Sequence, residues 1–83
     1  AVCGGSGAFL IADAKRAGAD VYITSDVKYH EYFGADGQIQ LLDVGHYESE
    51  WQTSGLISNK IKEIFPNFAV RLSQTRTNPV SFR

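Results

Sequence analysis

His46 and Glu50 are the two residues of this sequence whose types and spacing best suit metal chemistry. Residues four apart on a helix lie on the same face, and a neutral imidazole and an ionised carboxylate are both common ligands of divalent cations. A structural interpretation competes, because carboxylates such as Glu48 and Glu50 stabilise the first turn of a helix and His46 can be a turn residue. Two ligands do not complete a site, so spacing alone favours the structural interpretation.

A glycine-rich turn follows the apolar start of the chain. Gly5, Ser6 and Gly7 precede a helical pattern, and free backbone N–H groups at such a junction can bind a phosphate or a carboxylate. The turn lacks the G-x-G-x-x-G fingerprint, because Leu10 stands three residues after Gly7, and it also lacks the lysine of a P-loop. A tight turn in which larger side chains would clash explains the glycines equally well.

The segment from Thr24 to His30 contains three further polar candidates. Asp26 can be a metal ligand, an acceptor that supports a ligand, or the N-cap of the next helix, which is the more frequent use of aspartate there. Lys28 and His30 can bind an anionic substrate or transfer protons. Because residues two apart do not share a helix face, a solvated surface is the somewhat stronger interpretation of these two.

Apolar runs that alternate with helical patterns predict the elements that must position these residues. Strands are expected at residues 1–3, 21–24, 39–44 and 68–73. Helices are expected at about residues 8–17, 27–33 and 47–65. The order β-α-β-α-β-α-β predicts a three-layer α/β/α fold with a mostly parallel sheet. Ligands of such folds bind beyond the carboxyl ends of the strands, and both histidines fall at or just after those ends.

Length, composition and charge exclude several classes of protein. The 83 residues are 43% hydrophobic and 20% charged, with a net charge of −1, which suits one globular domain over residues 1–83. Lys and Arg do not cluster, so nucleic acid is not an expected partner, and no apolar run approaches the ~20 residues of a membrane span. The single cysteine and the absence of a signal peptide favour a cytoplasmic location. Because the chain opens inside a strand pattern without a methionine, we expect a carboxy-terminal fragment of a longer protein.

Four blocks of the sequence resemble the carboxy-terminal end of the Nif-three-like dinuclear metal-centre proteins, which are often labelled GTP cyclohydrolase I type 2 homologues. The blocks are AVCGGSG (1–7), GADVYITSDVKYH (18–30), DVGHYESE (43–50) and TNPV (77–80). The resemblance implies two similar α/β/α halves, a toroidal hexamer, and two divalent metal ions in the cleft between the halves. It also implies that His46 and Glu50 are ligands, since they match the family's late histidine and the glutamate four residues on.

The same resemblance implies what this chain lacks. The family's remaining ligands belong to the amino-terminal half, so that half and further copies of the protein are the expected partners, and the chain alone is not expected to hold a metal tightly. Zinc, iron or manganese would suit the ligands. Asp26, Lys28 and His30 are expected near the same cleft. The family usually has glycine where this chain has Ser25, and we expect that departure to change a backbone preference rather than the chemistry.

Three functions are compatible with these observations. A metal-dependent hydrolase would use two bridged cations to generate hydroxide near neutral pH, on a substrate that the residues do not identify. The alternative is a non-enzymatic metal-binding ring or scaffold that interacts with other proteins. A nucleotide-binding domain that uses the glycine turn is the third, and the missing dinucleotide fingerprint argues against it. The residues do not decide between enzyme and scaffold.

Overall fold

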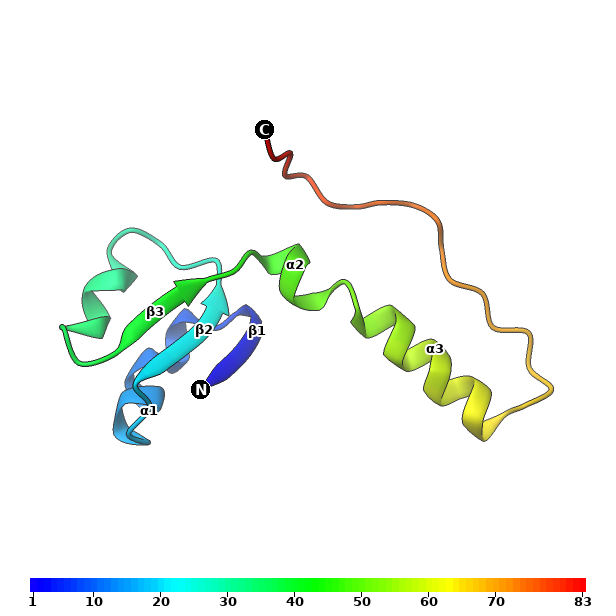
Figure 1. The fold of residues 1–83 in the computed structure, drawn as a ribbon, viewed down its shortest axis with the longest axis horizontal. Coiled ribbons are helices and arrows are strands. Elements are labelled where there is room, and N and C mark those ends of the chain that lie inside the picture. Colours follow the sequence, from blue (N-terminus) through cyan, green and yellow to red (C-terminus); the bar gives the residue numbers. More distant parts are fainter. The chain divides into compact units, whose positions relative to one another are not determined.

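Three parallel strands form the sheet of this protein. The computed structural model describes residues 1–83 and divides them into two units, Ala1–Glu50 and Trp51–Arg83. In the first unit, β1 (Val2–Ser6), β2 (Val21–Ser25) and β3 (Gln40–Asp43) lie in the order β1-β2-β3 (Figure 1). The register of β2 with β3 is continuous, whereas β1 slips against β2 between Val2 and Ser6. The predicted α/β class with a parallel sheet is confirmed.

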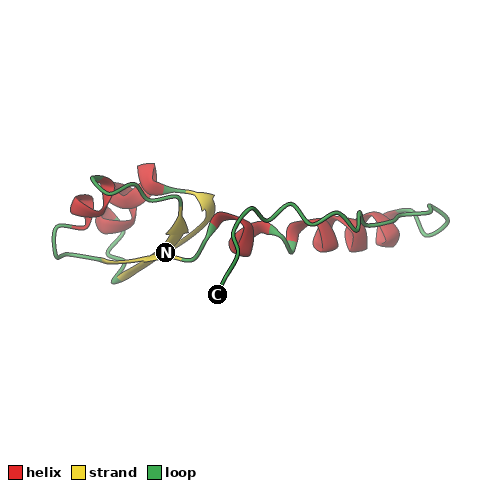
Figure 2. Ribbon diagram, turned by 90° about the horizontal axis from the view of Figure 1, so that it is seen from above, coloured by secondary structure: helices red, strands yellow, loops and turns green.

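Short helices cover one face of this sheet. The 3-10 helix η1 (Ala8–Leu10) runs into α1 (Ile11–Arg16), and a second 3-10 helix, η2 (Glu31–Ala35), precedes β3. Figure 2 shows these helices on the same side of the strands. The core between the two layers is small, because only four apolar side chains are buried. These are Ile11, Ala14, Tyr22 and Ile39.

The helix predicted over residues 27–33 is wrong, because the structure has only η2 in this region. Two side chains bind the backbone N–H groups that would begin a helix. Asp43 Oδ2 accepts from the N–H of Val27 at 3.1 Å, and Glu31 Oε2 accepts from the N–H of Lys28 at 2.7 Å. Side chains that accept from N–H groups in this way cap the start of a helix, and the helical turns begin only after them, at Glu31.

The long helix predicted over residues 47–65 is divided into α2 (His46–Glu50) and α3 (Thr53–Ile64). Residues 52–55 read Gln-Thr-Ser-Gly, and threonine, serine and glycine all have low helix propensity. Ser54 Oγ also donates to the carbonyl of Trp51 at 3.1 Å. The predicted end before Pro66 is confirmed, since α3 stops at Ile64. None of the helices combines the length and the apolar character that a membrane span requires.

The fourth strand predicted over residues 68–73 is wrong, since the structure has no strand after β3. The alternation of Phe68, Val70 and Leu72 fits a half-buried strand. A strand also needs a neighbour for its N–H and C=O groups, and the unit Trp51–Arg83 contains no other strand. The residues after Pro66 form no regular element.

Candidate metal centre

His46 and Glu50 come together at the start of α2, the helix that follows β3. His46 is its first residue and Glu50 its last, so one helical turn separates them. The Nε2 atom of His46 lies 3.1 Å from Oε2 of Glu50, and both side chains are about half exposed. The four-residue spacing therefore places an imidazole nitrogen and a carboxylate oxygen side by side at a surface that solvent reaches.

Asp26 contacts the other nitrogen of the same imidazole. Its Oδ2 atom lies 2.5 Å from Nδ1 of His46, and it stands one residue beyond the end of β2. The hydrogen bond to Asp26 is the largest cause that raises the pKa of His46 above its ordinary value. Partial desolvation opposes it, and the charges of Asp26 and Glu50 add to it. In the neutral tautomer with Nδ1–H donating to Asp26, Nε2 carries the lone pair that a metal ion would use.

Titration of His46 tests this arrangement in the metal-free protein. We expect a pKa above the ordinary 6.5, and we expect Asp26→Asn to lower it, because an amide bears no charge. A raised pKa favours the folded state below pH 6.5, and that contribution is lost as pH rises through the folded-state value. NMR of the imidazole protons measures both pKa values. Asp36→Asn is the control, and an equal shift in that variant would contradict the assignment.

Gly5 forms a backbone wall against the His46–Glu50 pair. Its φ is +67°, a conformation that residues with a Cβ rarely adopt. A Cβ built at Gly5 would collide with the carboxylate of Glu50 and lie 3.2 Å from Nε2 of His46. Gly5 thus places backbone without a side chain next to the two candidate ligand atoms.

Three hydroxyl groups connect Gly5 to the neighbouring elements. Ser49 Oγ accepts from the Gly5 N–H at 2.9 Å and donates to the carbonyl of His46 at 2.9 Å. The Gly5 carbonyl accepts from Ser25 Oγ at 2.7 Å and from Thr24 Oγ1 at 3.3 Å. Since these bonds span β1, β2 and α2, they fix the glycine turn relative to the His46–Glu50 pair.

Ser25 contributes through its side chain, and the expectation that its departure from glycine changes a backbone preference stays a prediction. Its exposed fraction is 0%, and its hydroxyl supplies one of the bonds to Gly5. The left-handed conformation lies one residue later, at Asp26, with φ +56°.

The glycine turn allows close packing. A Cβ at Gly7 would collide with the hydroxyl groups of Thr24 and Tyr22. Tyr22 also donates to the Gly7 carbonyl at 2.8 Å, and its burial raises the pKa of its phenol. The Gly5 N–H already donates to Ser49. Anion binding by Gly5, Ser6 and Gly7 stays a prediction.

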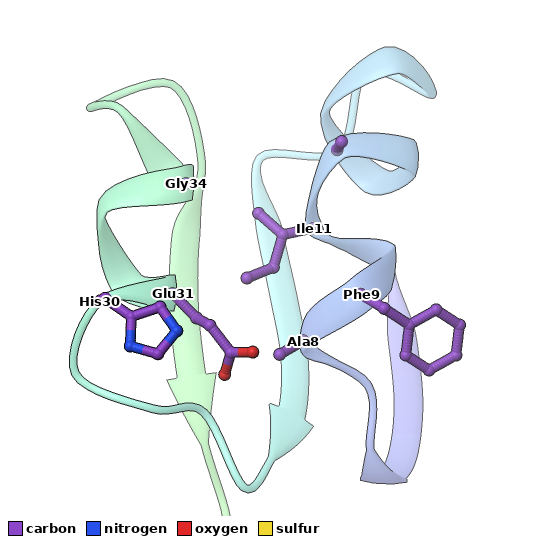
Figure 3. A pocket seen from close by; sticks show the side chains of 7 residues that line it. Ala8, Phe9, Ile11, His30, Glu31 and Gly34 are labelled. Carbon is purple, nitrogen blue, oxygen red and sulfur yellow. The ribbon is translucent and has the colours of Figure 1, made fainter.

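His30 lies in a cleft between η1–α1 and η2, with a volume of about 270 Å³. Figure 3 shows the His30 ring and the Glu31 carboxylate on one wall, with Ala8 and Ile11 opposite. The lining residues include neither His46 nor Glu50. Lys28 is exposed, and its backbone N–H donates to Glu31. Of the three nearby candidates, Asp26 is the one that contacts the His46–Glu50 pair.

The sequence did not indicate two residues that build this site, Ser49 and Asp43. Ser49 lies three residues after His46, so one helical turn directs its hydroxyl back to the His46 carbonyl. Asp43 ends β3, and its two carboxylate oxygens accept from the N–H groups of Val27 and Gly45. The sequence could have indicated Asp43 by its position at the carboxyl end of a predicted strand, where ligand-binding loops begin.

The pair fits part of a metal centre. With bonds of about 2.1 Å, two donors on one tetrahedral zinc lie roughly 3.4 Å apart, close to the 3.1 Å between Nε2 and Oε2. No group of three or more His, Cys, Asp or Glu side chains in the chain could hold an ion. Asp26 does not extend the pair, because it contacts the opposite nitrogen of the ring. Further ligands would have to come from outside these residues.

Fold and site together define an α/β unit that presents a histidine–glutamate pair at the carboxyl edge of a parallel sheet. The chain belongs to the Duf34/NIF3 (NGG1p interacting factor 3) family, whose model matches residues 1–79.

Relatives and solved structures agree with this membership. A Clostridium perfringens protein named GTP cyclohydrolase 1 type 2 homolog is 42% identical over 66 residues, which are 76% of this chain and 24% of that protein. A Staphylococcus epidermidis protein of the same name is 33% identical over 100% of this chain and 24% of its own length. A Staphylococcus aureus hypothetical protein superposes with a TM-score of 0.86 at 30% identity, over 99% of this chain and 29% of its own. The chain spans about a quarter of the length of the curated relatives it matches.

Proposed function

We propose that His46 and Glu50 are ligands of a centre of two divalent metal ions, which residues outside this chain complete. The observation that carries this proposal is the approach of Nε2 and Oε2 to 3.1 Å beside the bare backbone of Gly5. The imidazole and carboxylate admit zinc, iron or manganese. The amino-terminal half of the same protein would supply the other ligands, within a hexameric ring in the cytoplasm.

The reaction that such a centre supports best is hydrolysis. Two bound cations lower the pKa of water and polarise the atom under attack. Asp26 would hold the His46 ring, and the Gly5 backbone would limit how ligands approach the pair. The name GTP cyclohydrolase 1 type 2 homolog, which relatives carry, supports a nucleotide as the class of substrate.

A second candidate is a non-enzymatic ring that binds metal and other proteins. The family description, which names an interacting factor, favours this candidate. Turnover separates the two: a metal-loaded full-length protein that hydrolyses no nucleotide or phosphoester would favour the scaffold.

Elemental analysis of the full-length protein that carries these residues tests the metal ligands. We expect about two metal ions per chain in the wild type, as in other two-metal sites, and fewer in His46→Ala and Glu50→Ala. His30→Ala is the matched control, because His30 does not contact the pair. Circular dichroism would verify that each variant is folded. Unchanged metal content in both ligand variants would contradict the proposal.

A further inference from the structure

We propose that Asp26 is a positioning residue that holds the His46 ring with Nε2 directed at the metal. This inference rests on the proposed function, in which His46 is a ligand. Asp26 itself would not touch the metal, because it contacts Nδ1 and the candidate ligand atom is Nε2. Histidine ligands commonly donate their second N–H to a carboxylate, which fixes the tautomer and the orientation of the ring.

The backbone of Asp26 is the first observation. Its φ of +56° lies in the left-handed region, which costs a residue with a Cβ roughly 1–2 kcal/mol and is readily adopted by glycine. Such conformations persist where the surrounding structure enforces them, often at functional sites. Aspartate is one of the few residues with a Cβ that adopt this conformation, so the position can supply a carboxylate that glycine would lack.

The anchoring of Asp26 is the second observation. The next residue, Val27, donates its N–H to Asp43 Oδ2 at 3.1 Å, and Thr24 pairs with Asp43 across β2 and β3. The backbone on both sides of Asp26 is thus anchored to β3, whereas His46 and Glu50 belong to α2. Contact from a second element fixes the ring in a way that residues of α2 alone could not.

The decisive variant is Asp26→Gly in the full-length protein. It removes the carboxylate and also the strain of the left-handed backbone, so we expect an equal or higher melting temperature. We also expect about 10–100-fold weaker metal affinity. Asp26→Asn keeps an oxygen acceptor and tolerates the left-handed backbone, so we expect it to recover part of the loss. Asp36→Gly is the matched control. Asp36 is the other non-glycine residue with a positive φ, at +50°, and its carboxylate accepts from Gln38.

Two measurements give the result. Competition with a chelator measures zinc affinity, and nitrogen-15 NMR of the metal-free protein, at a pH above the pKa of His46, reports which ring nitrogen of His46 carries the proton. We expect the Nδ1–H form in the wild type and in Asp36→Gly, and a mixture of tautomers in Asp26→Gly. Equal zinc affinity and an unchanged tautomer in Asp26→Gly would overturn the inference, as would an affinity loss that accompanies unfolding in both Asp26 variants. If the wild type binds no zinc, the proposed function fails, while the tautomer measurement still tests the contact between Asp26 and His46.

Discussion

Gly5→Ala is expected to remove most of the bound metal from the full-length protein. The new methyl group would collide with the carboxylate of Glu50 and crowd Nε2 of His46. One of the two side chains must then rotate away, which separates the candidate ligand atoms. We expect the metal content to fall toward that of His46→Ala, measured by elemental analysis.

Gly18→Ala is the control that separates crowding from backbone strain. Gly18 has a φ of +77°, and a Cβ there would meet nothing within 4 Å. We expect both alanine variants to lose roughly 1–2 kcal/mol of unfolding free energy from the left-handed conformation, and only Gly5→Ala to lose metal. Urea denaturation measures the first quantity. A Gly5→Ala protein with full metal content would show that the close approach of the Gly5 backbone to His46 and Glu50 is not needed for metal binding.

Ile11→Ala is expected to cause the largest loss of stability. Ile11 is only 5% exposed and belongs to a core of four buried side chains, so few neighbours can move to fill the cavity. Truncation of a buried isoleucine costs about 2–5 kcal/mol, a large part of the roughly 5–15 kcal/mol that stabilises a typical domain. Urea denaturation, followed by circular dichroism, gives the free energy of unfolding.

Ile11→Val provides a graded comparison. Removal of one methyl group is expected to cost about 0.5–1.5 kcal/mol. The ratio of the two losses tests whether burial of Ile11 is the cause. Equal stability of wild type and Ile11→Ala would contradict the description of this core.

The sheet could be predicted from the sequence because its signals are local. The β-branched and aromatic run that begins at Val21 lies between Gly18 and polar residues, and the alternation of strands and helices specifies a parallel order. The start of the helical segment after β2 could not be predicted in the same way. The loop at Val27 depends on Asp43, a residue 16 positions away. The missing fourth strand shows the same limit, because a pattern at Phe68 does not provide a partner strand.

The candidate site also combines a feature that a local pattern predicts with features that only the folded chain brings together. The proximity of His46 and Glu50 follows from the period of one helix. Asp26 had three open interpretations, and only the sheet brings its carboxylate to Nδ1 of His46. The bond between Gly5 and Ser49 joins residues 44 positions apart, and no local pattern could indicate it.

The strand order β1-β2-β3 also has a consequence for how the chain folds. Each pairing of the central strand joins residues about twenty positions apart, Val2 with Ile23 and Val21 with Gln40. The length-dependent part of closing such a loop is roughly 2.7 kcal/mol for each pairing, so either closure can come first. Asp26 and His46 are separated by 20 positions and meet in the closure that pairs β2 with β3, whereas the Gly5 wall arrives only when β1 docks. We therefore expect the imidazole to be oriented when β2 pairs with β3, and its surroundings to be completed when β1 pairs with β2, whichever pairing comes first.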